Sequence, residues 1–336
     1  MNALLPWHAS LWSRLAPRIV EARLPHALLL CGPTGVGKAG FAQVLTQSLL
    51  CEKVQADGYA CGNCNACHLF AIGNHPDLLY IEPEEDAKTI TVDKIRALSA
   101  FMNLMPQHAR TRVVVVPQAH LMNSNAANSL LKNLEEPPSH GKFILITDRL
   151  SSLLPTIRSR CQRIDFTPPP LAEARTWLHL QPHQGDSDAA LALADGAPLR
   201  ALHLMQEGAW PRRAAVFEEF QRMVSGAQEP VALAEKWLKS NPADILHWME
   251  SWLSDIVRCK LAQDAGRWRN PDFAGPLTRL ADGVDVQAVL TLLTHTQKAL
   301  RGLSTSANVQ LMLEGIAIDC TALRALPVST NGDHLK

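Results

Sequence analysis

The sequence lacks a long apolar run, and no stretch approaches the roughly 18 residues that a membrane-spanning helix needs. It also lacks a charged and then apolar leader at Met1. Neither sign of charge is in excess, since Lys plus Arg and Asp plus Glu both total 32. This balance gives no bulk electrostatic reason to bind nucleic acid or a membrane. We therefore expect a cytoplasmic protein that makes no membrane contact and whose DNA contacts are local or belong to a partner.

Short apolar runs alternate with helical patterns from Ala27 to Phe166. The runs are continuous rather than alternating in polarity, which is typical of strands buried on both faces of a parallel sheet. They are HALLLC, DLLYIE, RVVVV, KFILI and QRIDF. Asn123 or Ser124 is the expected cap of the third helix. The series predicts an α/β fold with a parallel sheet and flanking helices.

Pro168 to Pro170 interrupt this pattern, and no strand is predicted after them. A chain of 336 residues favours two or three compact units. We assign residues 1–167 to the α/β core, 168–208 to a small helical domain and 209–330 to a larger one. In the larger one, apolar residues recur at helical spacing along ADILHWMESWLSDIVRC. Core packing is the expected explanation of this stripe, with an oligomer interface as the alternative.

The stretch GPTGVGK lies between a predicted strand and a predicted helix. In that context backbone N–H groups around Gly32, Gly35 and Gly37 can wrap phosphates, and Lys38 can reach the terminal ones. The alternative is a glycine turn without function. Ala39 stands where a serine or threonine hydroxyl normally ligates Mg²⁺. We expect that ATP or ADP binding is possible but doubtful, and that metal-assisted chemistry is compromised.

The second element of such a site is an acidic pair at the end of a hydrophobic strand. Here RVVVV continues into Pro117 and Gln118, which supply neither a metal carboxylate nor a base. With Ala39, these positions make three independent losses in one site. We therefore expect no ATPase activity from the chain on its own.

Half of the eight cysteines crowd into one segment, residues 51–67. Cys51, Cys61, Cys64 and Cys67 are spaced C-x9-C-x2-C-x2-C, and four thiolates suit a closed, structural Zn²⁺ site. His68 is an alternative fourth ligand, and a redox dithiol is a further alternative. The clustering favours metal binding over secretory disulfides.

Four stretches together resemble the clamp-loader branch of the AAA+ ATPases, and within it the subunits of bacterial DNA polymerase III. They are RLPHALLLCGPTGVGK, the cysteine segment, RVVVVPQAHLMNSNAANSLLKNLEEPPSHGKFILITDR and LLPTIRSRCQRIDF. The resemblance spans Pro25 to Phe166, and the helical remainder, with NVQLMLEGIAID, is similar in layout. It implies an AAA+ core of P-loop NTPase type, an all-α lid and an all-α collar.

This family loads a ring-shaped sliding clamp onto primed DNA, using ATP held between neighbouring subunits. By resemblance, the partners are gamma or tau and delta subunits in a hetero-pentameric ring, with the clamp and primed DNA reached through the complex. The hydrolysing gamma and tau subunits keep the acidic pair and the metal-binding hydroxyl. Their lid also carries an arginine, at the position where GAPLRAL places Leu199 with Arg200 one residue late.

The motif Ser159-Arg160-Cys161 is intact. By resemblance, Arg160 is an arginine finger that reaches the γ-phosphate held by a neighbouring motor subunit. A surface salt bridge is the alternative for Arg160, and Arg158 lies outside the motif. Thr147 matches the family's sensor threonine, with an ordinary strand-end residue as the alternative.

Three functions follow as hypotheses. The first is a non-hydrolysing ring subunit that supplies Arg160 in trans. The second is an active ATPase of gamma or tau type whose acids are displaced to Glu135 and Glu136, although these lie roughly 20 Å along the helix after the strand. The third is a zinc-dependent DNA-binding module, which is disfavoured because Lys53 is the nearest basic residue to the cysteines.

Overall fold

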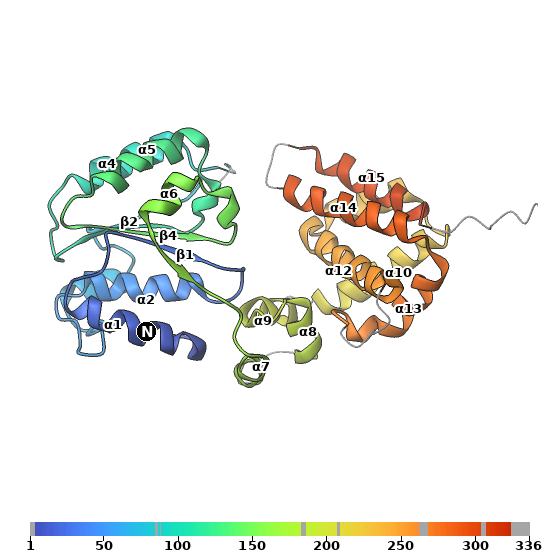
Figure 1. The fold of residues 1–336 in the computed structure, drawn as a ribbon, viewed down its shortest axis with the longest axis horizontal. Coiled ribbons are helices and arrows are strands. Elements are labelled where there is room, and N and C mark those ends of the chain that lie inside the picture. The colour runs from blue at the N-terminus through green and yellow to red at the C-terminus, as the bar shows by residue number, and fades with distance from the viewer. Residues whose placement is uncertain are drawn as a thin grey trace, which may run out of the picture. The chain divides into compact units, whose positions relative to one another are not determined.

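The structure is a computed structural model that describes residues 4–84, 87, 89–182, 186–206, 209–261, 268–303 and 307–323. The chain divides into two compact units, one of Met1–Leu180 with Gly196–Arg200 and one of Gln181–Asp195 with Ala201–Lys336 (Figure 1). Among the described helices, none is both long and apolar enough to cross a membrane.

The first unit is built on a parallel sheet of five strands in the order β2-β3-β4-β1-β5. Because β1, β3 and β4 carry continuous apolar runs, nearly all of their residues are buried and both faces of the sheet can be covered. The strands are β1 (Ala27–Cys31), β2 (Leu78–Tyr80), β3 (Arg112–Val116), β4 (Gly141–Thr147) and β5 (Gln162–Asp165). The predicted α/β fold is confirmed.

Helices cover both faces of this sheet (Figure 1). One face carries α1 (Ala9–Val20) and α2 (Lys38–Leu50), and the other carries α4 (Val92–Met102), α5 (Ser124–Glu135) and α6 (Pro155–Arg160). The remaining elements of the unit are η1 (Pro6–His8), α3 (Asn65–Ala71), η2 (Ala119–Leu121), η3 (Leu150–Ser152) and α7 (Leu171–His179). The N-cap of α5 is Asn123, whose side chain accepts the Ala126 N–H at 2.8 Å.

The second unit is helical throughout its described part. Its elements are α8 (Ser187–Leu193), the rest of α9 (Pro198–Gln206), α10 (Ala209–Val224), α11 (Pro230–Lys239), α12 (Pro242–Leu261), η4 (Pro271–Phe273), α13 (Ala274–Gly283), α14 (Val286–Gly302) and α15 (Val309–Thr321). The apolar stripe of α12 is buried within this unit, with Trp252 and Leu253 fully enclosed. Core packing is therefore confirmed for the stripe.

The division into two units runs through the segment predicted as a lid. Helix α7 and residues Gly196–Arg200 belong to the first unit, whereas Gln181–Asp195 belongs to the second. The assignment of 1–167, 168–208 and 209–330 to three domains stays a prediction. Residues 207–208 and 324–330, at the expected ends of the lid and the collar, lie outside the described residues.

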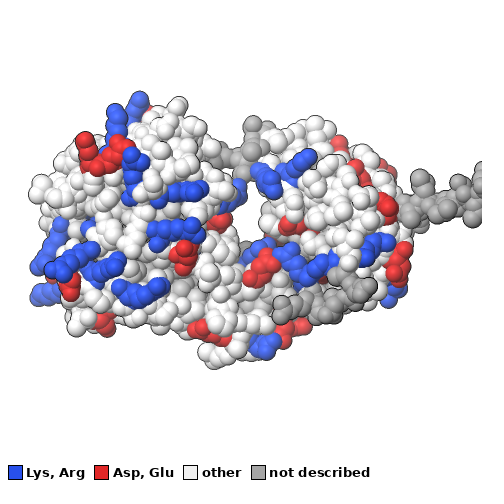
Figure 2. Space-filling view, in the orientation of Figure 1, with Lys and Arg blue, Asp and Glu red and all other residues white. Residues whose placement is uncertain are grey.

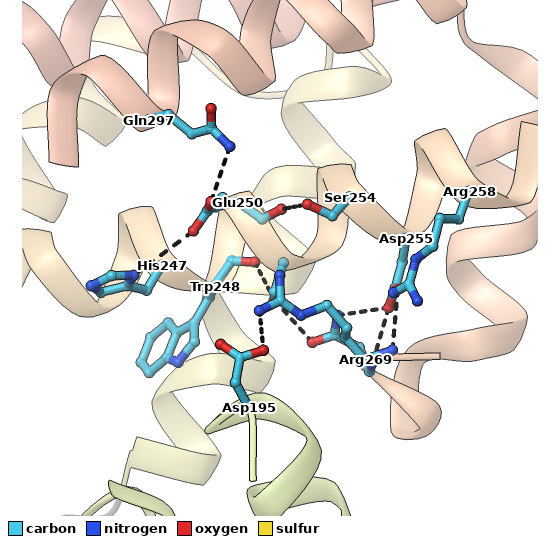
Figure 3. Close-up of polar contacts among 11 residues, drawn as sticks. Asp195, His247, Trp248, Glu250, Ser254, Asp255, Arg258, Arg269 and Gln297 are labelled. Atoms are coloured by element: carbon cyan, nitrogen blue, oxygen red, sulfur yellow. Dashed lines mark hydrogen bonds and ion pairs between the residues drawn. The ribbon is translucent and has the colours of Figure 1, made fainter. Parts of the chain in front are cut away.

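A buried carboxylate organises the polar interior of the second unit. Asp255, on α12, is 1% exposed and accepts the backbone N–H groups of Arg269 at 3.1 Å and Asn270 at 2.9 Å. It also accepts the Asn270 side-chain amide and pairs with Arg258. Arg269 in turn pairs with Asp195, as Figure 3 shows. One side chain thus fixes the segment that leads into η4.

Removing the Asp255 carboxylate leaves several N–H donors without an acceptor. We expect Asp255→Ala to lower the free energy of unfolding by about 3 kcal/mol, because the Asn270 N–H groups lose their acceptor inside the fold. Urea unfolding followed by circular dichroism measures the change. Asp282→Ala removes an exposed carboxylate of α13 and should change stability by less than about 0.5 kcal/mol. Equal effects of the two substitutions would contradict this account.

Candidate functional site

The glycine loop joins the end of β1 to the start of α2, as the sequence predicts. Its conformation requires glycine at three points. Gly35 has φ +83°, and a Cβ there would lie 2.5 Å from the Arg200 Cβ. Gly37 has φ +96°, and a Cβ there would lie 2.4 Å from a Leu5 methyl carbon. Gly32 likewise has a positive φ, +152°. The loop is therefore folded tightly beneath residues from two other segments.

Lys38 is turned into the loop that precedes it. Its Nζ donates to the carbonyl oxygens of Gly32 and Pro33, both at 2.7 Å, and the residue is only 8% exposed. Burial lowers the pKa of Lys38, and the charge of Asp148 opposes that shift. The ammonium group expected to contact the terminal phosphates thus donates its hydrogen bonds to carbonyl oxygens of the loop itself.

The loop is also covered from outside. The carbonyl oxygen of Val36 accepts the Trp7 indole N–H at 3.0 Å and lies 3.0 Å from His8 Nε2. Burial lowers the pKa of His8 to about 4, so the ring is neutral at physiological pH. The Leu199 N–H donates to the Gly35 carbonyl at 3.0 Å. Leu199 therefore lies directly at the loop but brings an apolar side chain rather than a guanidinium.

Sequence reasoning missed the acidic residue that the fold brings to this loop. Asp148 follows β4, and its carboxylate accepts the Thr34 hydroxyl at 2.9 Å and lies 3.3 Å from His120 Nδ1. Thr147 Oγ1 accepts the Arg149 N–H at 3.0 Å and lies 3.3 Å from His120 Nδ1. The available signal was the position of Asp148 directly after a predicted strand, where parallel strands place polar groups at one sheet edge.

His120 completes this group. Burial lowers the pKa of its imidazole, with Asp148 opposing the shift and Arg149 and Lys38 adding to it. Pro117 and Gln118 follow β3 at the same sheet edge and bring no carboxylate. The loop therefore meets a single carboxylate among the contacts just described, and that carboxylate is already held by Thr34 and His120.

Arg160 is the last residue of α6 and is held at its surface. Its Nη2 lies 2.7 Å from Glu135 Oε1, and its Nη1 donates to the Thr156 carbonyl at 3.0 Å. The side chain is 35% exposed. Ser159 donates to the Thr156 carbonyl, and Cys161 is buried, so the three-residue motif is anchored on both sides. Glu135, named above as a displaced catalytic acid, is instead the partner of this arginine.

The four cysteines meet in space. The sulfur atoms of Cys51, Cys61, Cys64 and Cys67 lie within 4.8 Å of one another. A tetrahedral Zn²⁺ with bonds of about 2.3 Å sets its sulfur ligands about 3.8 Å apart, and the Cys51 and Cys64 sulfurs are 3.9 Å apart. His68 contributes no donor atom to this group, which the described residues limit to the four cysteines.

Backbone N–H groups point at these sulfurs. Cys51 Sγ accepts from Lys53 and Cys61, and Cys64 Sγ accepts from Cys67. Burial raises the pKa of Cys51 and Cys67, whereas the pKa of Cys61 falls to about 7, chiefly because the Asn63 backbone N–H hydrogen-bonds its sulfur. Such donors stabilise thiolates, which are the form that binds a metal. The donor set and its spacing therefore fit zinc.

The chain is similar to known proteins along nearly its whole length. A family model described as "DNA polymerase III, delta subunit" matches residues 7–170, and one described as "DNA polymerase III, delta subunit, C terminal" matches residues 207–321. The DNA polymerase III subunit delta' of Pseudomonas aeruginosa is 37% identical over 331 residues, which covers 96% of this chain and 99% of that protein. The subunit delta' of Escherichia coli is 32% identical over 321 residues, which covers 93% and 94%.

A second kind of subunit is similar over a shorter length. The DNA polymerase III subunit tau of Bacillus subtilis is 31% identical over 196 residues, which covers 56% of this chain and 34% of that protein. The delta' proteins, by contrast, match along nearly the whole of both chains. The chain belongs to the family of DNA polymerase III delta' subunits.

Proposed function

We propose that this chain is a non-hydrolysing subunit of the DNA polymerase III clamp loader, which helps to load the sliding clamp onto primed DNA in the cytoplasm. In this role it joins gamma or tau and delta subunits in a pentameric ring. Its own glycine loop serves as scaffold, and Arg160 acts in trans as an arginine finger on the nucleotide of a neighbouring ATPase subunit. Membership of the delta' family supports the assignment to the complex.

The observation that carries the non-hydrolysing role is the end of β3, where Pro117 and Gln118 stand in place of the acidic pair of a working site. Lys38 donates to the Gly32 and Pro33 carbonyls at 2.7 Å, so a nucleotide phosphate would compete with these bonds for its ammonium group. Ala39 offers no hydroxyl to Mg²⁺, and Leu199 offers no charge at the loop. These positions therefore lack the metal ligands and the sensor charge that support hydrolysis.

A second candidate function is an active ATPase of gamma or tau type. Glu135 pairs with Arg160, so this one of the two acids considered for it loses support. Asp148 is a better placed acid, because it contacts Thr34 of the loop at 2.9 Å. Its pairing with Thr34 and His120 favours a structural role, and a direct assay separates the two functions.

The isolated chain should hydrolyse ATP no faster than background, since neither a metal-binding hydroxyl nor an unoccupied base lies at the loop. Lys38→Ala and Asp148→Asn should leave this background unchanged. Phosphate release by the purified chain, with and without Mg²⁺, is the measurement, and a nucleotide titration beside it reports binding. Clear turnover that either substitution abolishes would establish the ATPase function instead.

Arg160→Ala should impair the assembled complex without preventing its assembly. The guanidinium stabilises charge on the transferred phosphoryl group, so turnover at the neighbouring site should fall by about 10³-fold. DNA-stimulated ATPase activity and clamp loading by the reconstituted complex measure the loss. Arg158→Ala removes an exposed arginine of the same helix and is the matched control. Normal clamp loading by the Arg160 variant would refute the finger.

We also infer that Cys51, Cys61, Cys64 and Cys67 hold a structural Zn²⁺, because four sulfur ligands leave no open position for chemistry. The ion would tie the end of α2 to the start of α3.

Loss of this ion should destabilise the first unit. We expect Cys64→Ser to abolish the binding of one zinc per chain and to lower the melting temperature by at least about 5 °C, because metal-binding free energy contributes to folding. Atomic absorption and calorimetry measure the two effects. Cys259→Ser, outside the cluster, is the control and should keep the metal. Full zinc content in the Cys64 variant would argue against the site.

A further inference from the structure

A pocket of about 240 Å³ lies at the end of the first unit opposite the glycine loop. It is lined by the end of α1, the end of α2 and the segments that lead into β1, β3 and β4. We call it the α1–α2 pocket. Because the strands are parallel, their amino ends meet at this edge as their carboxyl ends meet at the loop. The pocket is therefore separate from the site described above.

Four cations line the α1–α2 pocket, and each comes from a different part of the chain. They are Arg18, Lys53, Arg110 and Lys142. None of the four forms an ion pair with any of the residues that the structure describes. One carboxylate, Glu52, stands among them, and it accepts the Ala66 N–H at 3.2 Å. Positive charge therefore exceeds negative charge by three among these side chains, four minus one.

The unpaired cations are informative because this chain has equal numbers of basic and acidic residues. Figure 2 shows Lys and Arg side chains crowded on the part of the first unit where α1 and α2 end. Lys142 is half-buried and donates to the Leu24 carbonyl at 2.6 Å, and burial lowers its pKa. A bound anion would supply the missing counter-charge.

The shape of the pocket restricts the anion. A volume of about 240 Å³ is below the range of about 300–1,000 Å³ typical of sites that enclose a drug-sized ligand. A phosphate group fits inside, while a larger body attached to it must continue outside. Ile19, Leu24 and Leu49 also line the pocket and give it apolar surface beside the cations. Guanidinium and ammonium groups around one cavity are the usual partners of phosphate oxygens.

We propose that the α1–α2 pocket binds a phosphate group through Arg18, Arg110 and Lys142, carried by a nucleic-acid strand or by a small free phosphate. The strand is favoured, because Arg18 and Arg110 are exposed at the surface around the pocket, where the neighbouring phosphates of a strand can also reach them. Lys53 also lines the pocket and lies two residues from Cys51, so the pocket borders the segment that carries the four clustered cysteines. Basic residues that are distant in sequence thus supply the phosphate contacts that the neighbours of the cysteines lack.

The test uses the full chain with its zinc content measured. Fluorescence anisotropy of a labelled oligothymidylate reports strand binding over a salt series. Arg18→Gln with Arg110→Gln should weaken binding at least about tenfold, and should lower the slope of log K against log salt by about 0.7 per cation removed. Lys142→Met, which keeps the buried stem, should weaken binding in the same direction. Lys53 is left unchanged because its backbone N–H donates to Cys51 Sγ, and a substitution there would disturb the cluster of four cysteines.

The matched control is Arg14→Gln with Arg96→Gln, which removes the same charge from exposed positions outside the pocket. It should bind within about twofold of the unchanged chain. Displacement of the strand by inorganic phosphate, beyond that by chloride at equal ionic strength, would identify the phosphate group itself as the ligand. Lack of displacement, with binding still lost in the pocket variant, would identify the strand. Equal weakening in the pocket and control variants, or no binding of either probe, would overturn the proposal.

Discussion

The parallel pairing of the central strands is the constraint on which both ends of the first unit depend. Leu29 pairs with Leu145 on one side of β1 and with Arg163 on the other, and all strands of the sheet point the same way. Every carboxyl end therefore opens on one edge and every amino end on the opposite edge. The first edge gathers the glycine loop, Thr147 and Asp148. The second gathers the cations of the α1–α2 pocket.

At the loop edge, contacts from several parts of the first unit hold the glycine loop in place. A lysine that faces open solvent keeps its charge free for a ligand, but Lys38 is enclosed and bonded to its own loop. Trp7 and Leu199 close the loop from two sides. Such a loop holds β1 and α2 in place. Glu135 on α5 pairs with Arg160 on α6 at the surface, and an exposed ion pair of this kind separates at small energetic cost.

The candidate site was partly readable from the sequence because its signals are local. The spacing of Cys51 to Cys67 and the run GPTGVGK each lie within a short segment, and the structure brings the cysteine sulfurs together as that spacing predicts. Asp148 and His120 were missed because their meeting depends on the order β3-β4-β1, which no local pattern encodes. The segment predicted as a lid is continuous in sequence, but its parts make their contacts in different units. Gln181–Asp195 belongs to the second unit and Gly196–Arg200 to the first.

The sequence by itself determined the α/β fold, the cysteine cluster and the lack of a hydroxyl or carboxylate side chain at Ala39, Pro117 and Gln118. Apolar periodicity, ligand spacing and the chemistry of single side chains depend on a few neighbouring residues, so they can be recognised from the sequence alone. Only the tertiary structure decided that Lys38 bonds its own loop, that Arg160 pairs with Glu135, and that Arg18, Arg110 and Lys142 share a pocket. Those contacts arise from strand order and helix packing, which bring together residues that are far apart in the chain.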